Sequence, residues 1–328
     1  MKGVPMQDNS FAERFPVHAM RGDATAVREY LRTTARAELL EHGAVLLRDT
    51  GLTETGELES MSRELMSTLY EAYTGGVVPR SNHSRYVFSS TELNGLFNLK
   101  LHNEMAYQRN YPRYITFFCE TPSRWGGQTP IAHESDIQRE LGGEFGARIA
   151  GDNVVYTRRY LSRDRHPSRV RRFPSMFVSW QDSFGTEDRA EVETKCAELE
   201  LKFEWSAEET LEVRSVLPVF RTLPETGREV FFNQVLTQNF SRGGLGTAGY
   251  AAHRLFGFST ASAPRHSAFE REGELTSADV ATLNRAYTRA EVSFRWRRGD
   301  WMLVDNLQAM HARRRFLGER SIWVVMGE

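Results

Sequence analysis

Two imidazoles and one carboxylate are the side chains in this sequence best suited to chemistry. His102 and Glu104 are separated by one residue, and His311 lies near the other end of the chain. Three such ligands on one side of a metal ion leave neighbouring coordination positions open, which is the arrangement of non-haem Fe(II) sites. Arg320, nine residues beyond His311, carries the planar fork that pairs bidentately with a carboxylate. Together the four residues predict a metal centre that binds a 2-oxo acid.

The spacing of these residues indicates which elements must position them. At the end of a strand, residues i and i+2 point to the same side, so His102 and Glu104 can reach one ion while Asn103 points away. His311 must come from a distant strand or turn. The apolar stretch 301–305 (WMLVD) predicts a buried strand just before it.

Other interpretations of the same three ligands stay open. An H-x-E triplet often occurs by chance. The three ligands could also hold zinc in a hydrolase, or a metal in a binding or sensor protein that turns nothing over. The position of Arg320 separates these cases, because only an oxygenase needs an anchor for a 2-oxo acid. We interpret the remaining histidines as structural: His18, His42, His83, His133, His166, His253 and His266.

Helical spacing of apolar residues predicts helices around the strands. One helix is expected from a cap at Asp23 to Gly43, and a second is expected to end at Gly75–Gly76. The second is marked by Leu58, Met61, Leu65 and Leu69. Two later helices are marked by Val192, Cys196 and Leu199, and by the capping pair Thr276 and Asp279 with Val280, Leu283 and Tyr287.

Runs of β-branched and aromatic residues predict strands along most of the chain. The runs are 44–48, 114–119, 154–160, 230–233, 292–296, 301–305 and 321–326. Many strands, few helices and no regular βαβ alternation favour a mainly β fold, an antiparallel barrel or jelly roll with flanking helices.

The bulk composition excludes several classes of protein. The chain of 328 residues has a net charge of −1, so no excess of positive charge points to nucleic acid or to an anionic membrane. No window approaches ~18 uninterrupted apolar residues, and the N-terminal stretch lacks the apolar run of a secretory signal. Only two cysteines are present, Cys119 and Cys196, which favours a reducing cytoplasm over a disulfide framework.

A series of motifs in a fixed order extends beyond the metal ligands. They are Pro79-Arg80, Ser89-Ser-Thr-Glu92, Leu101-His-Asn-Glu104 with Tyr107, Gly126-Gly-Gln-Thr-Pro-Ile131, Pro224-Glu-Thr-Gly227, Phe231-Phe-Asn-Gln234, Gly299-Asp-Trp-Met-Leu-Val-Asp-Asn306, His311-Ala-Arg and Phe316-x-Gly318-x-Arg320. From about Gly43 to the C-terminus, this order resembles the taurine dioxygenase (TauD/TfdA) superfamily of Fe(II)/2-oxoglutarate oxygenases. Within it, the chain is most similar to the clavaminate synthase-like and syringomycin-type (SyrP-like) amino-acid hydroxylases.

The resemblance implies a double-stranded β-helix, a cupin-like jelly roll, and a single domain over residues 1–328 with a helical region at about 20–76 packed on the barrel. His102, Glu104 and His311 match the ligands of Fe(II). Arg320 matches the anchor of the distal carboxylate of 2-oxoglutarate, and Thr129 matches a hydroxyl donor to the same cosubstrate.

The implied activity is hydroxylation of an unactivated C–H bond of an amino acid or amino-acid derivative in natural-product (antibiotic) biosynthesis. O2 is the second cosubstrate, and succinate and CO2 are released. Glu104 argues against halogenation, because halogenases of this superfamily have a small residue at that position. Desaturation, epoxidation or ring closure, and a catabolic reaction that releases sulfite, remain alternatives.

Substrate contacts are harder to predict. Arg80, Ser90 and Asn233 lie in segments that approach substrate in relatives. The stretch 158–172 carries Arg158, Arg159, Arg163, Arg165, Arg169, Arg171 and Arg172, opposed locally only by Asp164. It is interpreted either as a solvated loop, paired with the acidic residues at 187–193, or as a docking patch for an acidic carrier protein that bears a tethered amino acid.

Overall fold

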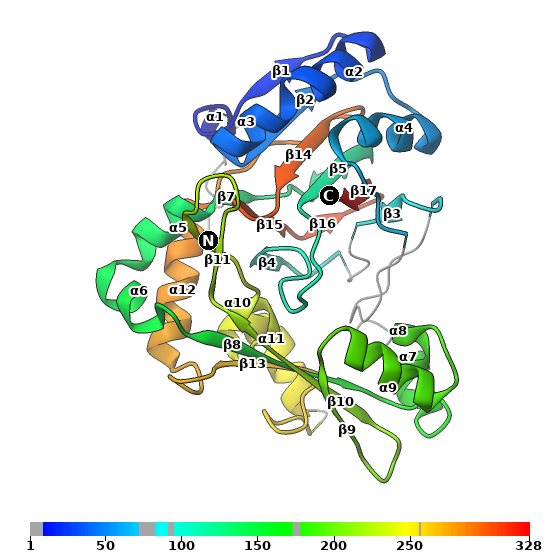
Figure 1. Cartoon of the computed structure of the whole chain (residues 1–328), viewed down its shortest axis with the longest axis vertical. Coiled ribbons are helices and arrows are strands. Elements are labelled where there is room, and N and C mark those ends of the chain that lie inside the picture. Colours follow the sequence, from blue (N-terminus) through cyan, green and yellow to red (C-terminus); the bar gives the residue numbers. More distant parts are fainter. Residues whose placement is uncertain (1–8, 72–82, 91–94, 173–177, 256) are drawn as a thin grey trace.

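A computed structural model describes residues 9–71, 83–90, 95–172, 178–255 and 257–328. Its centre is a six-stranded sheet, seen in the upper half of Figure 1. In spatial order the strands are β1 (Val17–Ala19), β2 (Ala44–Arg48), β14 (Trp301–Asp305), β5 (Tyr114–Thr121), β17 (Ser321–Gly327) and β3 (Phe88–Ser89). All neighbours are antiparallel except β1 and β2.

A smaller sheet packs on one face of this sheet. It consists of β4 (Leu99–His102), β15 (Ala309–Arg313) and β7 (Ile131–His133). Phe117 and Met302 of the large sheet share one buried cluster with Ile131 and Ala309 of the small sheet. Two antiparallel sheets with apolar side chains between them form the expected jelly roll, so the predicted fold class is confirmed.

A further sheet forms the lower part of the molecule in Figure 1. Its order is β13 (Arg265–Phe269), β8 (Asn153–Tyr160), β10 (Leu211–Pro218) and β9 (Lys202–Trp205). Burial alternates strictly along β8 and β10, as expected when one face packs on a core. Two short ribbons complete the strands: β11 (Phe220–Thr222) with β12 (Glu229–Phe231), and β6 (Trp125–Gly126) with β16 (Phe316–Leu317).

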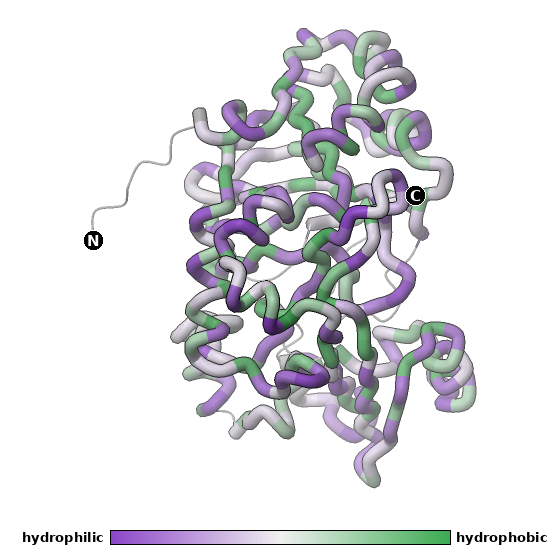
Figure 2. The backbone as a smooth tube through the Cα atoms, turned by 60° about the vertical axis from the view of Figure 1, so that its left-hand side comes forward, coloured by the Kyte–Doolittle hydropathy of each residue, from purple (hydrophilic) through white to green (hydrophobic). Residues whose placement is uncertain are grey.

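Helices surround the sheets. They are α1 (Asn9–Ala12), α2 (Ala24–Thr33), α3 (Ala35–His42), α4 (Thr55–Leu65), α5 (Glu134–Leu141), α6 (Gly143–Ile149), α7 (Pro167–Arg172), α8 (Trp180–Phe184), α9 (Arg189–Glu198), α10 (Val235–Gln238), α11 (Arg242–Leu255) and α12 (Ser277–Ala290). Hydrophobic stretches run through the interior in Figure 2, and hydrophilic stretches are frequent on the outer turns. No helix among the described residues is long and apolar enough to cross a membrane.

The N-terminal helices differ from the prediction in their ends. The helix expected between Asp23 and Gly43 is broken at Thr34, whose φ of −123° is not helical, although Asp23 caps the start and Gly43 ends α3 with a φ of 82°. The second helix ends at Leu65, well before Gly75–Gly76. After Leu65 the backbone becomes extended, and Leu69 forms a β-bridge with Gly327 of β17. Strand pairing therefore overrides the helical spacing of Leu69.

Most predicted strands are confirmed. The run 230–233 is shorter than expected, since β12 ends at Phe231. The strand expected at 292–296 is wrong: only Val292 forms a bridge, to Ile131, while Phe294 and Trp296 are buried without a ladder. Burial rather than sheet pairing explains the aromatic residues of this run. The capping box of Thr276 with Asp279 is confirmed at the start of α12.

Candidate metal centre

The strands of the small sheet bring the predicted ligands together. His102 is the last residue of β4 and pairs directly with His311 in the middle of β15. Glu104 follows in a turn that Met105 tightens with a φ of 54°. Directly opposed residues of an antiparallel pair project from the same face, so the two imidazoles lie side by side, with ring centroids 4.3 Å apart.

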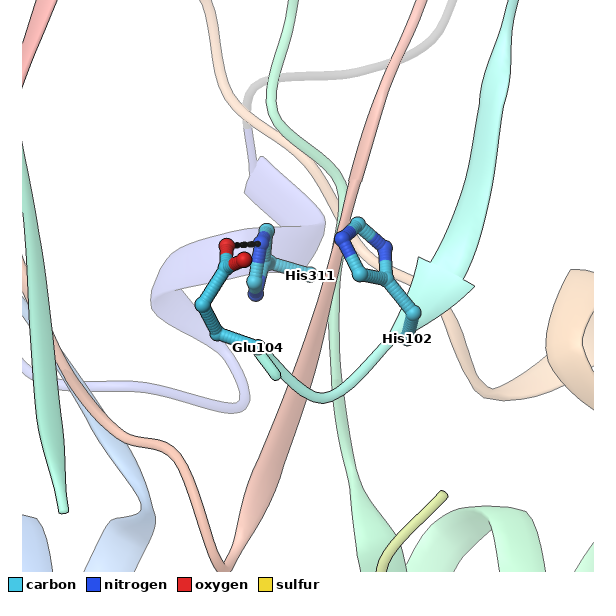
Figure 3. Close-up of side chains that lie close together, drawn as sticks. All are labelled: His102, Glu104 and His311. Carbon is cyan, nitrogen blue, oxygen red and sulfur yellow. Dashed lines mark ion pairs between the residues drawn. The ribbon is translucent and has the colours of Figure 1, made fainter. Parts of the chain in front are cut away.

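The three side chains converge on one point. Each offers a ligand atom, and these atoms lie within 4.8 Å of one another. His311 Nε2 and Glu104 Oε2 are 3.5 Å apart, the pair that is dashed in Figure 3. All three side chains are at most 5% exposed. A buried carboxylate between two imidazoles is a donor set that a divalent cation would neutralise.

One hydrogen bond prepares His102 for this role. Its Nδ1 lies 2.9 Å from the carbonyl oxygen of Lys100, which can only accept, so Nδ1 carries the proton. The neutral ring then has its lone pair on Nε2. A backbone carbonyl that sets the tautomer of a histidine in this way is typical of metal sites.

Asn306 holds the turn that carries Glu104. Its side-chain oxygen accepts from the Glu104 backbone N–H at 2.7 Å, and its amide donates to the Glu104 carbonyl at 3.0 Å and to the Pro112 carbonyl at 2.8 Å. Asn306 is fully buried and directly follows β14. Asn306 belongs to one of the sequence motifs, but no role was predicted for it. Its hydrogen-bond partners, Glu104 and Pro112, are 202 and 194 residues away in the sequence.

Asn103 braces the same turn from behind, as its orientation away from the metal predicts. Its amide donates to the Asn306 carbonyl at 2.7 Å, and its side-chain oxygen accepts from the Asn233 backbone N–H at 3.0 Å. The Asn233 side chain bonds the backbone of Val219 and Val235. Asn233, predicted from the sequence as a substrate contact, therefore has its side chain hydrogen-bonded within the fold.

Arg320 lies in a pocket beside His311. The pocket holds about 330 Å³, part of it open to solvent, and is lined by Ser90, Leu99, Phe117, Thr129, His311, Ala312, Arg313, Arg320 and Val324. The Arg320 guanidinium donates to Gly127 O at 3.0 Å and to Ser90 Oγ at 3.0 Å. No carboxylate lies within ion-pair distance of Arg320 among the described residues. Burial, aided by the charge of Arg313, lowers the pKa of Arg320 to about 9. A carboxylate ligand would offset this desolvation.

The hydroxyl of Thr129 has its proton available for a ligand. Thr129 Oγ1 lies 3.1 Å from Trp296 Nε1 and 3.4 Å from an Arg320 nitrogen, and both of these nitrogens can only donate. With its lone pairs directed to these donors, the hydroxyl can donate its own hydrogen into the pocket. Thr129 and Arg320 therefore offer donors to the same anion. No local pattern in the sequence indicated that Trp296 would contact Thr129.

Besides Asn233, the sequence predicted substrate contacts at Ser90 and Arg80. Ser90 lines the same pocket as Arg320, and its hydroxyl oxygen accepts a hydrogen bond from the guanidinium. Arg80 lies outside the described residues. Arg313, which the sequence analysis gave no role, lines the same pocket, and burial lowers its pKa to about 10.

Four arginines of the stretch 158–172 contact other parts of the fold. Arg158 is buried and lies 4.5 Å from the centre of the Tyr107 ring. Others pair with acids from later in the chain: Arg159 with Glu212, Arg163 with Asp182 and Glu187, and Arg165 with Glu209. The expected pairing with the acidic segment at 187–193 is confirmed for Glu187. These contacts do not support a docking surface for a carrier protein.

Comparison with known proteins identifies the family. The model of the taurine catabolism dioxygenase TauD, TfdA family matches residues 11–326. The chain belongs to the TauD/TfdA family. The dapdiamide synthesis protein DdaC of Enterobacter agglomerans is 28% identical over 296 residues, which cover 88% of this chain and 83% of DdaC. A clavaminate synthase-like protein of Arabidopsis thaliana is 26% identical, over 87% of this chain and 81% of the relative.

Solved structures share the TauD/TfdA fold. PvcB from Pseudomonas aeruginosa superposes with a TM-score of 0.51 at 14% identity, covering 95% of this chain and 85% of PvcB. AAD-2, solved with Mn(II) and N-oxalylglycine, superposes with a TM-score of 0.51 at 12% identity, covering 96% of this chain and 93% of AAD-2. As a TauD/TfdA protein, the chain is a dioxygenase that depends on iron and 2-oxoglutarate.

The residues of the candidate centre fit this cofactor. Two neutral imidazoles and one carboxylate suit Fe(II), and the resulting single positive charge suits a dianionic 2-oxo acid. The half-buried Arg320, without a carboxylate partner among the described residues, and the Thr129 hydroxyl line the same pocket as His311. No cysteine belongs to the group, in contrast to most structural zinc sites.

Proposed function

We propose that this enzyme hydroxylates an unactivated C–H bond of an amino acid or amino-acid derivative in natural-product biosynthesis, with release of succinate and CO2. The observation that carries the proposal is the His102, Glu104 and His311 cluster with the Arg320 pocket directly beside it. The names of relatives support the substrate class. DdaC is described as a dapdiamide synthesis protein, and PvcB as an Fe, alpha-ketoglutarate-dependent oxygenase from an isonitrile synthetic pathway.

In this proposal, His102, Glu104 and His311 bind the iron. Arg320 pairs with the distal carboxylate of 2-oxoglutarate, and Thr129 donates a hydrogen bond to it. Iron with 2-oxoglutarate and O2 supplies the oxidant for the C–H bond.

The chain's own part is to bind, orient and exclude water. Asn306 and Asn103 hydrogen-bond the turn that carries Glu104. These bonds fix the backbone from which the carboxylate projects. Phe117, 4.9 Å from the His311 ring, and Val324 form an apolar wall of the pocket. Such a wall strengthens the charge pairing at Arg320, because water competes less for the guanidinium.

We further propose that residues 1–328 act as one domain, with the helices of 20–71 packed on the large sheet through Val27, Leu31 and Leu39. Both cysteines are free and buried, which supports the predicted reducing cytoplasm. The syringomycin-type branch and a role in antibiotic production remain predictions.

The spectrum of the loaded enzyme tests the proposed site. Without oxygen, Fe(II) and 2-oxoglutarate should together produce a weak visible charge-transfer band, and zinc in place of Fe(II) should produce none. Glu104→Ala should abolish the band and iron binding, because the centre loses its anionic ligand. Glu144→Ala, which removes an exposed carboxylate on α6, is the control and should leave the band unchanged. A normal band in Glu104→Ala would contradict the assignment.

The reaction itself is tested by a screen. Free, N-acylated and carrier-bound amino acids are incubated with Fe(II), 2-oxoglutarate and O2, and substrate-dependent succinate is measured together with product mass. An added oxygen atom supports hydroxylation. A product lacking two hydrogens would instead indicate desaturation or ring closure, and sulfite release would indicate the catabolic alternative.

A further inference from the structure

A second and larger pocket lies beside the strand that ends at His102. It is formed by residues 97–100, by α11 and by the start of β13, and it holds about 820 Å³ that opens to solvent. Leu99 lines this pocket and also the smaller pocket that contains His311 and Arg320. Leu99 therefore borders both pockets, and the larger pocket lies along β4, the strand that ends at His102.

The lining of this larger pocket is basic. Among its eleven described lining residues are Lys100, His253 and Arg265, and none is acidic. The whole chain has 42 basic and 43 acidic residues, so the excess is local. Lys100 donates to Asn284 Oδ1 at 2.7 Å, which uses one of its three N–H groups.

His253 adds an acceptor to these cationic groups. Its Nδ1 lies 2.8 Å from the Gly249 carbonyl oxygen, so Nδ1 carries the proton of the neutral ring and Nε2 carries the lone pair. Burial, together with the charge of Arg265, lowers the pKa of His253 and favours this neutral form. A ligand with an N–H or O–H donor can therefore be recognised here, beside the groups that attract its anion.

Apart from Asn98 and Thr237, the remaining lining is apolar or glycine, and it leaves room for a ligand. Phe97, Leu245 and Ala252 supply hydrocarbon surface. A Cβ atom added at Gly249 would meet only the Leu245 Cβ at 3.6 Å, so the missing side chain leaves space. α11 is interrupted at Gly246, whose φ of 75° and ψ of 159° are not helical, and this kink shapes the wall of the pocket.

We propose that this pocket binds the enzyme's substrate through a free carboxylate held by Lys100 and Arg265, with an N–H or O–H donor directed to His253 and an apolar stem that extends past Leu99. The inference rests on the proposed function, because it specifies the substrate class of that reaction. An amino acid tethered to a carrier as a thioester has lost its α-carboxylate, so the pocket favours a free amino-acid derivative over a tethered amino acid without a side-chain carboxylate.

A matched pair of fluorescent probes tests the proposal. Dansylglycine combines a carboxylate, an N–H donor and an apolar ring, and its primary amide differs only in charge. The full-length enzyme is first loaded without oxygen with Fe(II) and saturating 2-oxoglutarate, so that the Arg320 site is filled. We expect dansylglycine to bind at least about tenfold more tightly than the amide, since a charge-assisted hydrogen bond contributes this much.

Single variants locate the binding site. Lys100→Met and Arg265→Gln should each weaken dansylglycine binding about tenfold and leave binding of the amide unchanged. Arg285→Gln, which removes an exposed arginine on α12, is the control and should change neither. Each variant must keep the charge-transfer band and the unfolding midpoint of the wild type; a variant that loses either is replaced by Lys100→Gln or Arg265→Met.

The possible results distinguish failure of the proposed function from failure of the substrate-binding proposal. A wild-type enzyme without the charge-transfer band would overturn the proposed function itself. A normal band overturns the present inference alone in three cases: dansylglycine does not bind, acid and amide bind equally, or acid binding is unaffected by both substitutions.

Discussion

At the scale of single residues, the candidate centre depends on hydrogen bonds that set the direction of each polar group. The Lys100 carbonyl fixes the tautomer of His102, and Asn306 fixes the backbone of Glu104. Thr129 shows how a neutral side chain becomes a directed donor, because Trp296 and Arg320 both donate to its oxygen. A side chain of the right type is thus made specific by its neighbours.

The role of Thr129 is testable with two substitutions. Thr129→Val keeps the shape but removes the hydroxyl, so the donor to 2-oxoglutarate is lost and the Trp296 N–H loses its acceptor. We expect the 2-oxoglutarate concentration for half-maximal charge-transfer absorbance to rise about tenfold or more. Thr129→Ser keeps the hydroxyl and should stay within about threefold of the wild type. Equal values for the two variants would contradict the role of the hydroxyl.

At the scale of elements, the site is assembled by paired strands and by the turn that leads into β7. Gly127 in this turn has a φ of 72°, and its carbonyl accepts from Arg320 Nε at 3.0 Å. A Cβ atom at Gly127 would lie 2.2 Å from Ser123 Oγ and 3.1 Å from Arg320 Cδ. Glycine is therefore needed here for the backbone and also for the place of the guanidinium.

Gly127→Ala should therefore weaken 2-oxoglutarate binding, measured by titration of the charge-transfer band, besides lowering stability by about 1 kcal/mol or more. Gly142→Ala is a control, because Gly142 also has a positive φ, of 79°, while nothing lies within 4 Å of the added Cβ. It should lower the free energy of unfolding without changing 2-oxoglutarate binding. Equal 2-oxoglutarate affinity in both variants would show that the close approach to Arg320 has no effect.

At the scale of the whole molecule, buried carboxylates make stability depend on pH in opposite directions. Burial, only partly offset by Arg48, raises the pKa of Asp300 to about 6, and Asp300 Oδ1 is buried without a hydrogen-bond partner among the described residues. The pKa of Asp279 is instead lowered: burial would raise it, but hydrogen bonds from Thr276 and Arg148 outweigh that effect. Asp300 therefore favours the native state when protonated, and Asp279 when ionised.

Because the pKa of Asp300 is raised and that of Asp279 is lowered, removing each carboxylate should change the pH dependence of unfolding in opposite directions. The native state holds the Asp300 proton between about pH 4 and pH 6 while the unfolded chain has lost it, so this group's contribution to stability falls as pH rises through that window. Asp300→Asn should therefore gain stability relative to the wild type across the window, by up to about 2 kcal/mol.

Asp279→Asn should behave in the opposite way. The contribution of Asp279 is present above its unfolded pKa and is lost as pH falls through its lower folded pKa, so the variant should be less stable than the wild type at neutral pH and approach it in acid. Urea unfolding at several pH values measures both variants. Difference curves that are flat with pH would contradict the assignment of these shifts.

The sequence by itself determined what short windows of chain encode. Local hydrogen bonds and side-chain period act over a few residues, so the cap at Asp23, the box at Thr276 and the alternation of β8 were predictable. The residue types at 102, 104, 311 and 320 likewise indicated a metal centre with an anchor for a 2-oxo acid, and the ordered motifs around them indicated iron.

Only the tertiary structure decided how distant segments meet. The pairing of His311 with His102, the support of Glu104 by Asn306 and the basic pocket of Lys100 and Arg265 join residues far apart in the sequence. Such contacts depend on sheet register and on the packing of whole elements, which no local pattern specifies. For the same reason, the acids that pair with Arg159, Arg163 and Arg165 became visible only in the folded chain.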